Sequence, residues 1–296
     1  MIPYISVSQF YKEKFGCKVY KISLDAGCTC PNRDGTKGLG GCIFCSEHGS
    51  GDFVPLEKSS VTEQIAKAKL LVKSKIKGNG KYIAYFQNFS ATYGDHSVLE
   101  SKYREALSQE DVVGLAIATR PDCIDDDMLL RLKKISTQYF VQIELGLQTS
   151  NENTGAFINR CYTDVDFADC VGRIQKVAPN IHVVAHVIFG LPFETVDDML
   201  ETVRFICAQK VGGIKFTVLY VVEHTKLADL YREKKFEALS KSEYFDILKK
   251  ALILLPQNMV VHRITGDPPK SLVVEPLWTL DKKRVLNELR TFLDRS

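Results

Sequence analysis

Three cysteines near the start of the chain constrain its fold and chemistry more than any other feature. Cys42 and Cys45 form a Cys-x-x-Cys pair, Phe44 directly precedes the second of them, and Cys30 lies upstream. Three thiolates at this spacing can hold three irons of a [4Fe–4S] cluster and leave the fourth iron open. Clusters that serve electron transfer usually have a fourth thiolate. The spacing therefore indicates a cluster whose open iron binds a substrate or a cofactor.

A zinc site is the alternative, because Cys28 completes a set of four cysteines. Structural zinc takes four tetrahedral sulfur or nitrogen ligands, which usually come from two Cys-x-x-Cys pairs. The Cys28-x-Cys30 spacing is too tight for such a pair. The loop between the two pairs carries glycines that let the backbone bend around a bulky group, namely Gly35, Gly38, Gly40 and Gly41. The sequence therefore favours an iron–sulfur cluster over zinc.

The cysteine loop resembles that of the radical S-adenosylmethionine (radical SAM) enzymes. The residues that carry the resemblance are Asp25-Ala26-Gly27, Cys30-Pro31-Asn32 and Gly41-Cys42-Ile43-Phe44-Cys45. The loop is similar in particular to that of the YhcC/YtqA-type branch, which is related to the radical SAM half of the elongator catalytic subunit. The resemblance implies that Cys30, Cys42 and Cys45 hold the cluster and that S-adenosylmethionine binds its open iron. It leaves Cys28 as a neighbour of the cluster, and it extends to about Trp278.

Composition is typical of a cytoplasmic globular protein. Hydrophobic residues make up 45% and charged residues 25% of the chain, which is ordinary for a folded domain. No apolar run reaches the roughly 18 residues that a membrane span needs, and the start of the chain lacks the order of a signal peptide. Nine cysteines indicate a reducing compartment and metal binding. We expect a cytoplasmic protein without a membrane span, and the sequence leaves its oligomeric state open.

Short apolar runs alternate with amphipathic stretches, as βα units around a parallel sheet require. The predicted strands are Lys18–Leu24, Tyr82–Phe86, Val113–Ala118, Phe140–Gly146, Ile181–Ile188 and Ile214–Leu219. Predicted helices follow most of them, at Val61–Lys75, Val98–Ser108, Asp126–Lys134, Asp164–Val177, Val196–Gln209 and Thr225–Arg232. Six such units fit the α/β fold that the resemblance implies, a partial (β/α)6 TIM-like barrel. We assign it to residues 1–235.

The regular alternation of predicted strands and helices ends after Arg232. Lys241–Leu255 and Lys282–Arg295 read as helices, and Met259–Ile264 reads as a strand. We therefore expect a small α+β extension over residues 236–296 that packs on the barrel. Within it, the run from His262 to Asp267 matches the pattern of the branch, and Arg263 is a candidate for contact with the substrate.

Barrel enzymes carry their chemistry at the carboxyl ends of the strands, so the polar residues after each predicted strand are candidate site residues. The resemblance implies that S-adenosylmethionine lies against Phe44, Gln87, Asn88, Glu144, Gln148, Gly190 and Leu191. It also implies that Arg120, Glu144 and Gln148 take part in catalysis.

Each candidate has a structural alternative. Arg120 can pair with Asp122 or Asp125, and Gln87-Asn88 can be an ordinary polar loop. Burying the Glu144 carboxylate inside an apolar strand is energetically unfavourable unless it is paired with another group or has a functional role.

Many relatives have glycine at the position of Phe193, so the turn there is expected to differ slightly. The remaining cysteines, Cys17, Cys123, Cys161, Cys170 and Cys207, are expected to be buried inert thiols.

The resemblance implies a radical SAM enzyme that cleaves S-adenosylmethionine to a 5′-deoxyadenosyl radical, which abstracts hydrogen from a substrate. It implies tRNA as the partner, with the wobble-uridine side chain, a carboxymethylaminomethyl group in this branch, as the target. It also implies a reductant such as flavodoxin or ferredoxin. A net charge of +3 permits RNA binding without requiring it. Two alternatives remain: a small-molecule or protein substrate for the same chemistry, and a zinc-binding nucleic-acid-binding protein.

Overall fold

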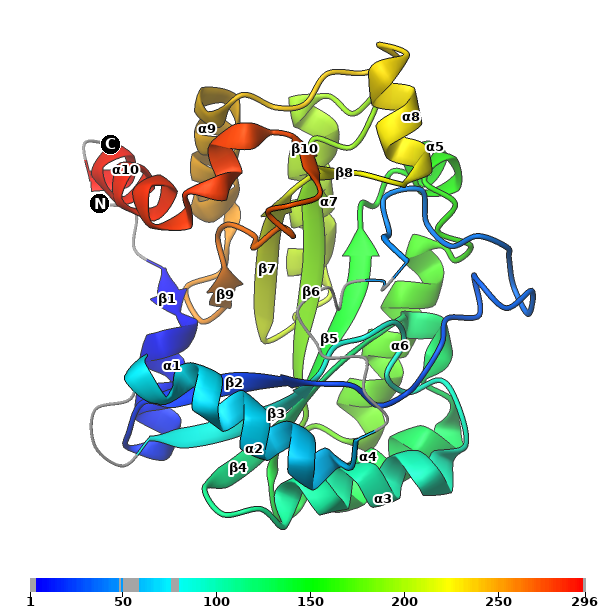
Figure 1. The fold of residues 1–296 in the computed structure, drawn as a ribbon, viewed down its shortest axis with the longest axis vertical. Helices are drawn as coiled ribbons and strands as arrows, with labels where there is room; N and C mark the ends of the chain where they lie inside the picture. The colour runs from blue at the N-terminus through cyan, green and yellow to red at the C-terminus, as the bar shows by residue number, and fades with distance from the viewer. Residues whose placement is uncertain (1–3, 48, 50–58, 76–79, 295–296) are drawn as a thin grey trace.

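The computed structural model describes residues 4–47, 49, 59–75 and 80–294. Among them, eight strands form one sheet in the order β1-β9-β7-β6-β5-β4-β3-β2 (Figure 1). All neighbouring strands in this sheet run parallel. The strands are β1 (Ile5–Ser6), β2 (Val19–Leu24), β3 (Lys81–Phe86), β4 (Val112–Thr119), β5 (Phe140–Gln148), β6 (His182–Phe189), β7 (Gly213–Val218) and β9 (Val260–Arg263).

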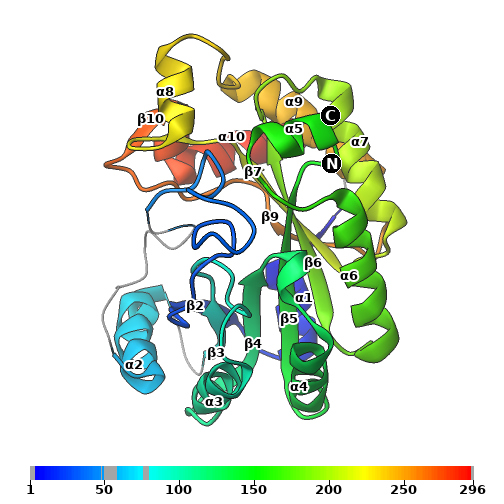
Figure 2. The ribbon, with the colours of Figure 1, turned by 90° about the vertical axis from the view of Figure 1, so that its right-hand side faces the viewer.

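The sheet curls into a half-barrel, and helices cover its outer side (Figure 2). These helices are α2 (Val61–Val72), which continues as a short 3-10 turn, α3 (His96–Leu107), α4 (Asp126–Ser136), α6 (Asp164–Val177) and α7 (Val196–Ala208). Each begins after a side chain that accepts hydrogen bonds from the first turn; these caps are Ser60, Asp95, Asp125, Thr163 and Thr195. The order of β2 to β7 follows the sequence, as repeated βα units require.

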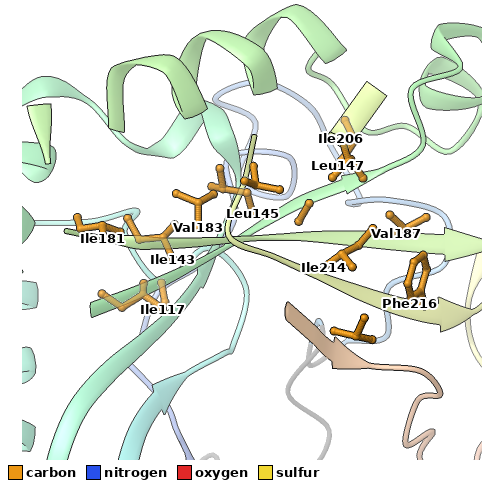
Figure 3. Close-up of a cluster of buried hydrophobic side chains, with 14 of the residues drawn as sticks. Ile117, Ile143, Leu145, Leu147, Ile181, Val183, Val187, Ile206, Ile214 and Phe216 are labelled. Carbon is orange, nitrogen blue, oxygen red and sulfur yellow. The ribbon is translucent and has the colours of Figure 1, made fainter. Parts of the chain in front are cut away.

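Apolar side chains on the outer side of the central strands form the main core (Figure 3). Ile143 and Leu145 of β5 are fully buried there, beside Ile117 of β4. Because side chains alternate along a strand, the residues between them, such as Glu144, point to the concave side. The concave side of the half-barrel therefore carries the polar residues of β5.

The C-terminal part of the chain extends the sheet. β9 lies between β7 and β1, α9 (Lys241–Leu254) packs on α7, and α10 (Lys282–Asp294) packs on α9. A separate antiparallel pair joins β8 (Val221–Val222) to β10 (Val273–Glu275). The expected extension thus contributes a strand to the half-barrel as well as covering it.

The predicted fold class is confirmed. The six predicted strands are β2 to β7, each within two residues at either end, and the predicted helices are α2, α3, α4, α6, α7, α8 (Lys226–Arg232), α9 and α10. The division at residue 235 stays a prediction. Arg295 and the first three residues of the chain lie outside the described part. No helix in that part is long and apolar enough to cross a membrane.

Sequence analysis missed α1 (Val7–Phe15) and α5 (Glu152–Phe157). α1 packs against the amino ends of the strands, where the ring of Phe10 lies 4.8 Å from that of His182 at the start of β6. Tyr11, which is buried, donates its hydroxyl to Gln142 at 2.9 Å. α1 therefore covers the end of the half-barrel opposite the expected site.

Candidate functional site

The loop that follows β2 gathers three cysteines at the carboxyl ends of the strands. Cys45 donates its backbone N–H to the Cys42 carbonyl at 3.0 Å. The two thiols are in hydrogen-bond contact, which lowers the pKa of Cys42 and raises the pKa of Cys45. Cys30 lies within electrostatic range of Cys45, and Nη1 of Arg120 is 4.0 Å from its sulfur. The three predicted ligands are thus neighbours.

A segment after α5 holds this loop in place. Asn159 donates its side-chain amide to the Gly41 carbonyl at 2.8 Å and accepts a bond from the Asn32 amide through its own carbonyl. Ile43 donates its N–H to the Ile158 carbonyl at 3.1 Å, and its carbonyl accepts from the N–H of Leu227 in α8 at 3.0 Å. Figure 1 shows the loop in blue beside α5 and α8. Backbone bonds from two other elements therefore fix its shape.

Cys28 belongs to a different environment. It packs against the main core, and burial raises its pKa to about 11. It lines a cavity of about 670 Å³ together with Tyr93, His96, Asp122 and Cys123. Among the described residues, no three His, Cys, Asp or Glu side chains converge on a site of ion size.

Of the remaining cysteines, Cys123 and Cys170 are buried as expected, but Cys17 and Cys207 are only half-buried and Cys161 is exposed. Cys161 lies within electrostatic range of Cys30 and Cys42. It follows Arg160 in the segment that supports the cysteine loop, and its φ of 59° turns the chain there. Cys161 is exposed because it lies in a loop rather than on a buried helix face.

Polar and apolar residues near the loop fit a bound cofactor. Asn88 is fully buried, and neither atom of its side-chain amide has a hydrogen-bond partner in the part of the chain described. A buried polar group without a partner is costly, and a polar ligand would satisfy it. Phe44 and Leu191 belong to one apolar cluster, and Gly190 beside them has a φ of 88° that glycine adopts without strain.

Arg120 is held rigidly next to the cysteines. Its guanidinium donates to both oxygens of Asp122 at 2.9 and 2.8 Å and to the Arg160 carbonyl at 3.0 Å. It lies 4.6 Å from the ring centre of Tyr162. Although burial opposes it, Asp122 raises the pKa of Arg120. The ion pair between Arg120 and Asp122, which is the structural alternative for Arg120, therefore forms and is buried. It holds the charged guanidinium of Arg120 beside Cys30.

Gln148 ends β5 in a strained conformation. Its φ is 65°, and the register of β5 against β6 shifts beside it. The Tyr162 hydroxyl lies 2.8 Å from both the Gln148 side-chain oxygen and the Gly146 carbonyl. Left-handed backbone at a residue other than glycine is often found at functional sites. Its predicted catalytic role stays a prediction.

Glu144 lies on the concave side, deeper than Gln148, and its carboxylate has both ion-pair and hydrogen-bond partners. Its carboxylate forms ion pairs with Lys21 of β2 and Lys215 of β7. It also accepts from the Tyr85 hydroxyl at 2.7 Å, and Nε2 of His186 is 2.9 Å away. Burial opposes ionisation, but these cations hold the pKa of Glu144 well below its usual range. The paired alternative for Glu144 is thus present, and its role beside the cofactor stays a prediction.

In the turn after β6, Phe193 adopts a left-handed backbone conformation that is usually found at glycine. Phe193 has a φ of 69°, and its exposed ring meets that of Phe157 at 5.0 Å. Next to it, Glu194 accepts a hydrogen bond from the Thr149 hydroxyl. Burial raises the pKa of Glu194 to about 7. The turn therefore ties the end of β6 to the loop after β5.

Comparisons of the sequence with family models and with known proteins decide the family. The family model for the radical SAM superfamily matches residues 30–206, and that for the Radical_SAM C-terminal domain matches residues 211–295. The chain belongs to the radical SAM superfamily. As a radical SAM enzyme it uses a [4Fe–4S] cluster and S-adenosylmethionine, and it needs an external one-electron reductant.

Its relatives include proteins of the branch that the motifs indicated. The chain is 40% identical to the uncharacterized protein YtqA of Bacillus subtilis, over 98% of this chain and 89% of that one. It is 27% identical to human Elongator complex protein 3, over 58% of this chain and 31% of the other. Among solved structures, archaeal Elp3 from Methanocaldococcus infernus superposes with a TM-score of 0.69 at 13% identity, over 94% of this chain and 63% of that chain. This last likeness shows the fold.

Several buried charged residues near the candidate site were not predicted from the sequence. Arg160 is fully buried and donates to the Leu147 carbonyl at 2.9 Å and to the Tyr162 carbonyl at 2.7 Å. Lys21 and Lys215 were missed although each is a charged residue inside an apolar strand. The same signal that singled out Glu144 would have found both lysines.

Replacing Glu144 by glutamine should destabilise the protein strongly, because it leaves Lys21 and Lys215 buried without their counter-charge. We expect the free energy of unfolding to fall by roughly 3–5 kcal/mol, measured by urea denaturation. Glu201→Gln is the matched control, since it breaks an exposed ion pair with Arg204 and should cost at most about 1 kcal/mol. Equal losses in the two variants would contradict the network.

Glu194 should make stability depend on pH. Its pKa rises from 4.5 in the unfolded chain to about 7 in the folded one, so the folded state holds the proton more tightly. The stability that this group contributes is present below pH 4.5 and is lost as the pH rises to about 7. The difference in stability between Glu194→Gln and wild type should change across that window and be flat above it. A difference that is the same from pH 4 to 8 would contradict this assignment.

Proposed function

We propose that this radical SAM enzyme modifies the side chain of the wobble uridine of tRNA, in the cytoplasm. The observation that carries the proposal is the sequence similarity to Elongator complex protein 3 over 58% of this chain. The Thr119-Arg120-Pro121-Asp122 motif, which resembles that of the elongator-like branch, lies beside the cysteine loop and supports it. Flavodoxin or ferredoxin is the proposed electron donor.

In this proposal, Cys30, Cys42 and Cys45 hold the cluster. Bound at the reduced cluster, S-adenosylmethionine supplies the 5′-deoxyadenosyl radical that abstracts a hydrogen atom from the substrate. Phe44 and Leu191, which share one apolar cluster, form the apolar wall for the adenine. Asn88 offers its unpartnered amide to the polar part of the cofactor.

Other residues of the chain position these groups. Arg120 sets a fixed positive charge near Cys30, where it offsets negative charge that builds up at the thiolates. Tyr162 holds the Gln148 side chain at the end of β5. Gln87 follows β3 and donates its backbone N–H to the carbonyl of Leu24, next to the loop. We propose that Gln87, Gln148 and Glu144 face the cofactor and the reacting group.

The test is an anaerobic incubation of the reconstituted enzyme with S-adenosylmethionine, dithionite and bulk tRNA that carries its natural modifications. We expect the mass of the wobble nucleoside to change and tRNA to increase the formation of 5′-deoxyadenosine. Cys42→Ala, which lacks one proposed ligand, is the control without turnover. If tRNA neither changes nor stimulates cleavage, while a small molecule or a protein does, the tRNA proposal is wrong.

A further inference from the structure

Positive charge accumulates on the concave side of the half-barrel. Lys21 of β2 and Lys215 of β7 both reach the carboxylate of Glu144, and each lies 4.9 Å from the ring centre of Tyr85. Arg263 is the residue of β9 that pairs with Lys215. It lies within electrostatic range of both lysines. Two basic side chains thus pair with the Glu144 carboxylate, and a third lies close to both of them.

Arg263 has a free guanidinium among the described residues, since none of them gives it a hydrogen bond or an ion pair. It is half-buried and close to Tyr220. The hydroxyl of Tyr220 is buried and lies against Gly266 and Thr265. A half-buried guanidinium without a protein partner among the described residues can pair with an anionic ligand.

The histidines and tyrosines near the three basic side chains are neutral. Burial lowers the pKa of His182 and of His186 to about 4, and it also lowers the pKa of His262, so these imidazoles are uncharged. Burial raises the pKa of Tyr11, Tyr85, Tyr220 and Tyr244, so their hydroxyls keep their protons. Burial lowers the pKa of Lys215 to about 7, and an anion bound beside this lysine would favour its charged form.

We propose that Arg263, with Lys215 and Lys21 beside it, binds a carboxylate at the end of the substrate's side chain. This inference rests on the proposed function and names the chemistry that selects the substrate. The planar guanidinium of Arg263 pairs with both oxygens of a carboxylate. Glu144 keeps the two lysine side chains directed toward the same space.

Depth favours a terminal carboxylate over a backbone phosphate. Lys215 precedes the carboxyl end of β7, Val218, by three residues, which corresponds to about 10 Å along the strand. A phosphodiester carries a ribose on each side and cannot descend that far between the strands. A single side chain that ends in a carboxylate reaches this depth.

The experiment compares two anticodon stem-loop RNAs that differ at one atom group. In one, the C5 side chain of the wobble uridine ends in a carboxylate, and in the other it ends in the isosteric carboxamide. Their binding to the reconstituted enzyme with S-adenosylmethionine is measured by fluorescence anisotropy. We expect wild type to prefer the carboxylate by roughly tenfold or more, as a bidentate charged pair predicts.

Variants of Arg263 test whether this residue causes the preference for the carboxylate RNA. Arg263→Gln should bring the two affinities within about twofold of each other, and Arg263→Lys, which keeps the charge, should restore part of the preference. Arg204→Gln, an exposed surface arginine on α7, is the matched control and should bind like wild type. Circular dichroism of each variant checks that it is folded.

Four distinct outcomes would overturn the inference. Wild type that binds both RNAs equally retains the tRNA function but refutes the carboxylate site. Equal losses for both RNAs in Arg263→Gln would show that the arginine contacts a phosphate. A weaker affinity of Arg263→Gln for S-adenosylmethionine itself would show that it holds the cofactor. Wild type that binds neither RNA would refute the proposed function together with this inference.

Discussion

The ion pairs of Glu144 hold together the concave side of the half-barrel. Lys21 comes from β2, three strands away from β5, and Lys215 comes from β7, two strands away in the other direction. One carboxylate can receive both lysines only if the sheet curls. The network therefore couples the curvature of an open sheet to the placement of charge inside it, and a buried carboxylate with two partners favours one arrangement of the strands.

The cysteine loop depends on a different set of contacts. Its backbone is bound by Ile158 and Asn159 after α5 and by Leu227 in α8, not by the strands beneath it. Arg120 and Arg160 then connect that segment to the ends of β4 and β5. Two arginines and several backbone groups therefore fix the shape of the loop that carries the thiols.

Much of the fold, and the family, could be predicted from the sequence. The strands β2 to β7 were predicted because apolar runs such as Tyr82–Phe86 are buried on both faces, and the cysteine spacing indicated the family that the comparisons confirm. α1 was missed because its apolar residues cover the strand ends rather than forming a continuous stripe against the sheet. The strained Gln148 and the register of Arg263 beside Lys215 arise from long-range packing, which no local pattern encodes. The unpartnered Asn88 is likewise visible only in three dimensions.

The central claim is that Cys30, Cys42 and Cys45, without Cys28, hold a cluster with one open iron. It is tested most directly by anaerobic reconstitution of wild type, Cys28→Ala and Cys42→Ala, followed by iron analysis and an assay for 5′-deoxyadenosine. The account predicts about four irons per chain and S-adenosylmethionine cleavage in wild type and Cys28→Ala, with both lost in Cys42→Ala. One tightly bound zinc in wild type, or loss of the cluster in Cys28→Ala, would contradict it.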